Sequence, residues 1–227
     1  NQFIGGIPDS LSLLTQLAEL KMSESGVSGK IPKSLAKLTK LETLTLSDNK
    51  LVGVVPNELG LLTSLTELSL STNKLLGPLP IGLCNLVSLQ QLKLQNNMIG
   101  GTIPNCGVGK LPSLAYVDLQ ANQLVGPLPT GICNLVSIQE LYLQSNKIGG
   151  TIPDCLGSVT TALGLDNNRF VGTIPATFSA LSYIDVSCNQ LTGTVPSEIC
   201  DAGGFVYHDC NEITCDVQNC CYCSTCP

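Results

Sequence analysis

LETLTLSDNKLVGVVPNELGLLTS, residues 41–64, is the stretch that decides the fold, because residues 65–88, LTELSLSTNKLLGPLPIGLCNLVS, repeat its frame. The frame contains a Gly-x-aliphatic-Pro phrase that recurs nine times, at Pro8, Pro32, Pro56, Pro80, Pro104, Pro129, Pro153, Pro175 and Pro196. A fixed period of this length predicts a solenoid, in which each coil buries its apolar face against its neighbours. We therefore expect function on a broad repeated surface rather than in one catalytic cleft.

Each repeat contains one short alternating segment. Leu44 and Leu46 alternate with Thr43, Thr45 and Ser47, a period of two that predicts a strand with one buried face. Strands stacked from coil to coil would form a parallel sheet on the concave side. The residues that follow each Pro are expected to make a helical turn on the convex side.

An asparagine follows each strand, where its amide can satisfy backbone groups that the turn leaves unpaired. These asparagines are expected to form a ladder of Asn49, Asn73, Asn97, Asn122, Asn146, Asn168 and Asn189. The glycine gives the next bend its backbone freedom, and the proline steers the chain away from a helix at that step.

The full phrase, L-x-x-L-x-L-x-x-N-x-L-x-G-x-I-P, resembles the plant-type extracellular leucine-rich repeat. That repeat occurs in receptor-kinase ectodomains and polygalacturonase-inhibiting proteins, and similar ones occur in secreted algal and diatom proteins. The resemblance covers residues 1 to about 200. It implies an α/β solenoid, a right-handed superhelix of about nine coils with a parallel concave sheet and a second small sheet near the G-x-I-P phrase. It also implies recognition of a protein, peptide or carbohydrate.

Composition points to an exported protein without a nucleic-acid partner. The net charge of −6 and the pI near 4.6 give no basic face for phosphates, and no apolar run is long enough to span a membrane. Twelve cysteines, none before Cys84, indicate an oxidising compartment. We therefore expect a secreted or cell-surface protein, with no cofactor.

Four cysteines follow a larger repeat, because the segments 84–106 and 133–155 are nearly identical. Their placement on the convex side of adjacent coils predicts the bridges Cys84–Cys106 and Cys133–Cys155. The rival bridge Cys106–Cys133 has similar geometry but leaves Cys84 and Cys155 without partners.

The remaining cysteines are Cys188, Cys200, Cys210, Cys215, Cys220, Cys221, Cys223 and Cys226. The leucine phrase stops near Cys200, so we expect a solenoid over residues 1–199 and a disulfide-rich C-terminal cap over residues 200–227. Zinc is the alternative, since Cys223 and Cys226 have C-x-x-C spacing with His208 nearby. A second C-x-x-C is missing, and no metal site is expected.

No catalytic arrangement is expected, because His208 is the only histidine and lies in the cap. Paired carboxylates for glycoside hydrolysis are the alternative, but acids on an open sheet should be solvated. Exposed tyrosines on the same face could anchor a ligand. The expected ligand-binding residues are Tyr116, Asp118, Glu140, Tyr142, Asp166, Tyr183 and Asp185. Ala162 and Gly164 should leave a shallow dip between Tyr142 and Tyr183.

The interpretation that follows is a non-enzymatic recognition module for an extracellular protein, peptide or glycan. The alternatives are a structural subunit of a fibre or wall and an inhibitor of a carbohydrate-degrading enzyme. Ice binding would need a flat regular threonine array, which Thr102, Thr151, Thr173 and Thr194 form only with interruptions. Asn1 already occupies the ladder position, so Phe3, Ile4 and Ile7 would be uncovered. We expect upstream chain or self-assembly through this end.

Overall fold

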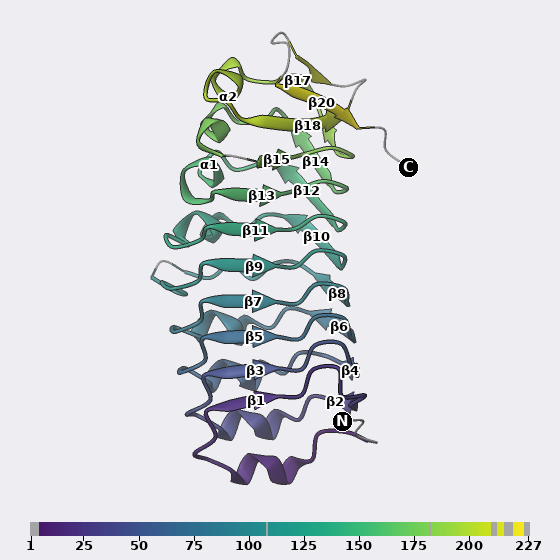
Figure 1. The fold of residues 1–227 in the computed structure, drawn as a ribbon, viewed down its shortest axis with the longest axis vertical. Helices are drawn as coiled ribbons and strands as arrows, with labels where there is room; N and C mark the ends of the chain where they lie inside the picture. Colours follow the sequence, from purple (N-terminus) through teal and green to yellow (C-terminus); the bar gives the residue numbers. More distant parts are fainter. Residues whose placement is uncertain (1–4, 108, 182, 210–212, 216–219, 225–227) are drawn as a thin grey trace.

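The computed structural model describes residues 5–107, 109–181, 183–209, 213–215 and 220–224, with the main chain alone at 209, 223 and 224. Its coils stack one above another from the N-terminal to the C-terminal end (Figure 1). The expected solenoid with a parallel concave sheet is confirmed. The expectations for Asn1, Phe3, Ile4, Cys210 and Cys226 lie outside the described residues.

The concave sheet has ten parallel strands, each paired with the strand of the next coil. In spatial order they are β1 (Glu19–Lys21), β3 (Thr43–Thr45), β5 (Glu67–Ser69), β7 (Gln91–Lys93), β9 (Tyr116–Asp118), β11 (Glu140–Tyr142), β13 (Ala162–Gly164), β15 (Tyr183–Asp185), β18 (Phe205–Asp209) and β20 (Cys221–Ser224). The middle residue of each strand from β1 to β15 points into the core, so the first and third residues face outward.

A second parallel sheet follows the asparagine turns, as the resemblance implies. It contains β16 (Gln190–Leu191), β14 (Arg169–Gly172), β12 (Lys147–Thr151), β10 (Gln123–Pro127), β8 (Met98–Gly101), β6 (Lys74–Pro78), β4 (Lys50–Gly53) and β2 (Ser28–Lys30). Two further strands, β17 (Gly193–Thr194) and β19 (Ile213–Thr214), pair with each other.

The convex side is built mainly from five-residue 3-10 helices, each starting directly after a repeat proline. They are η1 (Asp9–Leu13), η2 (Lys33–Lys37), η3 (Asn57–Leu61), η4 (Ile81–Asn85), η5 (Thr130–Asn134) and η6 (Ala176–Ala180). Two short α-helices, α1 (Leu156–Val159) and α2 (Ser197–Asp201), take the same place in later coils. The main chains of η3 and η4 approach closely: a Cβ on Gly82 would lie 2.2 Å from the carbonyl oxygen of Asn57.

The asparagine ladder forms as expected. Asn122 shows the pattern, because its Oδ1 accepts a hydrogen bond from the Ile99 N–H at 3.0 Å and its Nδ2 donates to the Leu94 and Leu119 carbonyls at 3.0 and 3.1 Å. Each amide therefore joins its own coil to the preceding one. In an apolar core this pairing removes the cost of leaving turn backbone groups without partners.

The core is incompletely filled at one coil. Val117 stands in register between Leu92 and Leu141, where most other strands place a leucine. An apolar cavity of about 70 Å³ lies beside Val117 and next to Cys84 and Cys106. The shorter side chain leaves part of this space unfilled.

Candidate ligand-binding face

Parallel register lines up the outward side chains of the concave sheet in two rows. One row, given by the first residue of each strand, runs through Tyr116, Glu140, Ala162, Tyr183 and Phe205. The other, given by the third, runs through Asp118, Tyr142, Gly164, Asp185 and Tyr207, and Tyr222 of β20 continues it in register with Tyr207. Strand β18 thus carries both rows into the C-terminal segment, and β20 extends the second of them.

The middle of the face contains charges that compensate one another. The Lys93 ammonium lies 2.9 Å from a carboxylate oxygen of Glu67 and 5.7 Å from the centroid of the Tyr116 ring. The Tyr116 and Tyr142 rings lie 5.8 Å apart, and the Tyr142 hydroxyl donates to Glu140 at 2.8 Å. Burial and the Glu140 carboxylate raise the pKa of Tyr142 to about 12. We call these five residues the central cluster.

Asp118 is not the solvated acid expected from the sequence. It is only 3% exposed, and its carboxylate accepts hydrogen bonds from the main-chain N–H and the side-chain amide of Gln120 at 3.1 and 3.2 Å. Burial raises the pKa of Asp118 even though these bonds oppose the shift. Its carboxylate is therefore already engaged within the protein.

Four aromatic rings meet at the C-terminal end of the face. The Tyr183 and Tyr207 ring centroids lie 5.9 Å apart, Tyr207 and Tyr222 stack at 5.3 Å, and Phe205 lies 6.0 Å from Tyr222. Despite these contacts, Tyr183, Phe205 and Tyr222 are 43%, 47% and 43% exposed. Sequence reasoning missed the three rings of the cap, although the alternation in FVYHD, residues 205–209, is typical of a strand.

Two carboxylates stand beside these rings. Asp185 accepts hydrogen bonds from the Ser187 main-chain N–H at 3.1 Å and from its hydroxyl at 2.7 Å, and the Tyr183 hydroxyl lies 3.5 Å away. Burial, followed by repulsion from Asp185, raises the pKa of Asp166 to about 6. We call Asp166, Asp185 and the four rings the terminal cluster.

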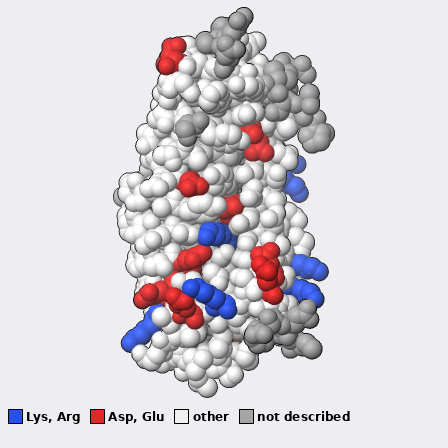
Figure 2. All heavy atoms as spheres, in the orientation of Figure 1, with Lys and Arg blue, Asp and Glu red and all other residues white. Residues whose placement is uncertain are grey.

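Cations are missing from the strands around the terminal cluster. No lysine or arginine lies in the strands described at β9, β11, β13, β15, β18 and β20. Apart from the grey atoms, Figure 2 shows acidic side chains continuing into the upper, C-terminal half of this face, where basic side chains appear only along one edge. The terminal cluster therefore combines negative charge with exposed aromatic surface.

The dip expected at Ala162 and Gly164 is filled. A Cβ on Gly164 would lie 2.6 Å from the side-chain oxygen of Gln144 and 3.2 Å from the Tyr142 ring. Neighbouring side chains thus pack over the glycine, and the expectation of an open depression was wrong.

The cysteines for which partners are described form disulfides. Cys84 joins Cys106 and Cys133 joins Cys155, the two pairs expected from the sequence. In the cap, Cys200 joins Cys220 and Cys215 joins Cys221, while Cys188 is also disulfide-bonded.

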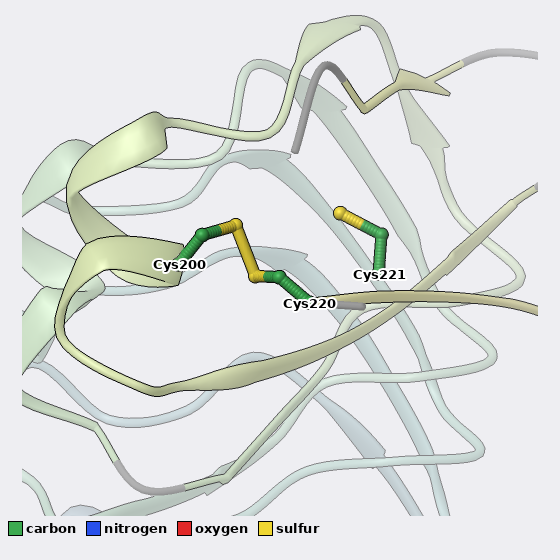
Figure 3. Close-up of side chains that lie close together, drawn as sticks. All are labelled: Cys200, Cys220 and Cys221. Carbon is green, nitrogen blue, oxygen red and sulfur yellow. A yellow bond between two sulfur atoms is a disulfide. The ribbon is translucent and has the colours of Figure 1, made fainter. Parts of the chain in front are cut away.

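Three cap sulfur atoms lie close enough together to resemble a metal site. Those of Cys200, Cys220 and Cys221 lie within 4.8 Å of one another, and Figure 3 shows two of them joined. Because all three belong to disulfides, none offers a thiolate ligand in this state. The side chains of Cys223 and Cys226, the alternative zinc pair, are outside the described set.

Comparison with known families agrees with this geometry. Leucine-rich-repeat models match residues 15–75, 137–159 and 180–202. Among solved structures, a plant peptide hormone receptor, RGFR1 in complex with RGF2, is 31% identical over 93% of this chain with a TM-score of 0.87. The chain is built of leucine-rich repeats and resembles plant leucine-rich-repeat ectodomains.

Other solved structures match as well. The Arabidopsis receptor kinase HAESA, in complex with the peptide hormone IDA and the co-receptor SERK1, is 30% identical over 93% of this chain, with a TM-score of 0.83. The chain spans 34% of the RGFR1 chain and 37% of the HAESA chain. A plant ice-binding protein is 28% identical over 85% of this chain and 71% of its own, with a TM-score of 0.65.

A search of curated proteins by sequence gives no match for this leucine-rich-repeat chain. Among the described residues, no helix has the length and apolar character needed to cross a membrane.

Proposed function

We propose that the chain is an extracellular, non-catalytic recognition module whose concave sheet binds a segment of peptide. The observation that carries this proposal is the exposed aromatic surface of Tyr183, Phe205 and Tyr222, held on adjoining strands of a rigid sheet. Aromatic side chains with few rotatable bonds bury a large area at low entropic cost, and they dominate many protein interfaces.

A peptide is the ligand class that the related structures favour. RGFR1 was solved with RGF2, and HAESA with the peptide hormone IDA. The two outward rows offer side chains at the strand spacing of about 4.8 Å, which suits an extended chain laid across several coils. A glycan stacked on the same rings, an enzyme partner and self-assembly into a fibre or wall are the competing outcomes.

The test is capture of low-molecular-mass material from the extracellular fluid of the source on the immobilised chain. We expect protease treatment of the fluid to abolish capture and glycosidase treatment to leave it unchanged. The double variant Tyr183→Ala, Tyr207→Ala should lose capture, whereas Leu61→Ser should keep it, because Leu61 is 61% exposed on the convex helix η3. Capture retained by the double variant, or sensitive only to glycosidase, contradicts the proposal. Light scattering of the same preparations detects self-assembly.

Ice binding is a second candidate, favoured by a column of exposed threonines. Thr151, Thr173 and Thr194 occupy the same repeat position in successive coils, and Thr214 pairs with Thr194. The column is interrupted at Pro127 on its N-terminal side. Thermal hysteresis measured on the intact chain decides this candidate, and Thr173→Lys should abolish any activity found.

A further inference from the structure

We infer that the terminal cluster binds a lysine or arginine side chain of the peptide, which lies against its tyrosine rings and beside Asp166 and Asp185. This inference rests on the proposed function for the peptide nature of the ligand. It further specifies that the recognised residue is positively charged and that the C-terminal end of the concave face recognises it.

The central cluster already contains a cation held by a carboxylate and a tyrosine ring. There, the single ammonium of Lys93 lies between the Glu67 carboxylate and the Tyr116 ring, at 2.9 Å from the carboxylate oxygen and 5.7 Å from the ring centroid. A cation over an aromatic face is attracted by the negative potential of the ring, and a nearby carboxylate adds to that attraction. The lysine is thus held by the same two kinds of group that the terminal cluster presents.

The terminal cluster has the rings and the carboxylates but lacks the cation. Its nearest outward neighbours along the described strands are Ala162 and Gly164, which carry no charge. The Ser187 hydroxyl and main-chain N–H hold the Asp185 carboxylate in place through hydrogen bonds, and no ion pair to Asp166 or Asp185 is found among the described residues. A ligand cation would occupy the place that Lys93 fills in the central cluster.

Electrostatics select the sign of the ligand. The two aspartates repel each other, and burial together with this repulsion raises the pKa of Asp166. Tyr183 and Tyr222 are exposed, and the faces of aromatic rings carry negative potential as well. A cationic side chain relieves this repulsion, whereas a glutamate or a free carboxylate would increase it.

The exposed area also suits a long cationic side chain. Tyr183 and Tyr222, at 43% each, leave ring surface for the aliphatic stem of lysine or the planar guanidinium of arginine. The hydroxyl of Tyr183 lies on the carboxylate side of the cluster, 3.5 Å from Asp185. Apolar and electrostatic contacts therefore become available to one side chain together.

The experiment uses three pentapeptide probes that differ only at the central residue: acetyl-Gly-Gly-X-Gly-Gly-amide with arginine, citrulline or glutamate. Citrulline keeps the shape of arginine without its charge. Binding to the full chain is followed by tyrosine fluorescence, which reports on five tyrosines without tryptophan. We expect the arginine probe to bind about tenfold more tightly than the citrulline probe, to weaken with salt, and the glutamate probe to bind most weakly.

Matched variants locate the effect. Asp166→Asn and Tyr207→Leu should each reduce the affinity for the arginine probe about fivefold, in line with one lost contact of this kind. Asp48→Asn removes the same charge from an exposed turn of an early coil and should change nothing. Equal loss in Asp48→Asn and Asp166→Asn would show that net charge alone attracts the probe, which overturns the inference.

Two further results also count against the inference. One is equal affinity for arginine and citrulline, and the other is no arginine binding at about 10 mM, the weak end expected for a single side-chain contact. In either case, capture of natural peptides that is lost in the double variant Tyr183→Ala, Tyr207→Ala leaves the proposed function standing. Failure of that capture refutes the proposed function itself.

Discussion

Replacing Asn122 by alanine tests whether the asparagine ladder holds adjacent coils together. The change removes the hydrogen bond from the Ile99 N–H and the bonds to the carbonyls of Leu94, Leu119 and Gln120. All three carbonyls keep a partner, since Asn97 Nδ2 still donates to Leu94, Asn146 Nδ2 to Leu119, and the main-chain N–H of Asn96 to Gln120. The Ile99 N–H thus loses the partner that the amide provided.

The magnitude follows from this count. A buried N–H left without a partner costs about 1–3 kcal/mol, and each hydrogen bond lost elsewhere about 0.5–1.5 kcal/mol. Because the three carbonyls remain bonded, we expect Asn122→Ala to lower the free energy of unfolding by about 3 kcal/mol. Asn122→Asp should be worse at neutral pH, because it turns a carboxylate oxygen toward the carbonyls of Leu94 and Leu119.

The assay is urea unfolding of the disulfide-intact chain, followed by circular dichroism and checked for a single transition. Gln123→Ala is the matched control, since Gln123 is the next residue and is exposed. A loss in Asn122→Ala within about 0.5 kcal/mol of the control, the usual range for surface substitutions, would refute the reasoning. So would an aspartate variant as stable as the alanine variant at pH 7.

Three further predictions concern packing and pH. Val117→Leu should fill part of the cavity beside it and raise the free energy of unfolding by about 0.8 kcal/mol; an unchanged or lower Tm would contradict this. Gly82→Ala should destabilise the chain by about 2 kcal/mol through the clash between η3 and η4, whereas Gly107→Ala, which meets no atom within 4 Å, should not. Because the folded pKa of Asp166 is raised to about 6 from 3.8, its ionisation opposes folding. The protonated Asp166 carboxyl therefore contributes its full stabilisation below about pH 4, and this contribution is lost as pH rises through 6. Denaturation measured against pH should show a weaker dependence in Asp166→Asn, and identical profiles would exclude this role.

Most of the fold could be predicted because each fixed position of the repeat has one physical task. Side chains alternate along a strand, so Leu44 and Leu46 point into the core together. Asn49 must follow them so that its amide can form hydrogen bonds with the backbone groups of the turn. The outward rows as far as Tyr183 follow from that frame, and the register confirms it.

The C-terminal part of the face could not be placed by the same argument. The leucine phrase ends before Phe205, so nothing in the sequence sets the register of the cap strands against β15. The packing of individual side chains could not be predicted from the repeat pattern either. The filling of the space over Gly164 depends on the conformation of Gln144, and the burial of Asp118 depends on its bonds to Gln120.

Because β18 and β20 extend the concave sheet, the repeats and the cap contribute to the same face under different sequence constraints. The repeats must keep their leucines and asparagines to stack at all, so they have little freedom to vary except at outward positions. The cap is held by the disulfides Cys200–Cys220 and Cys215–Cys221 rather than by that phrase. Exchange of this terminal segment alone could therefore give the same solenoid a different ligand specificity.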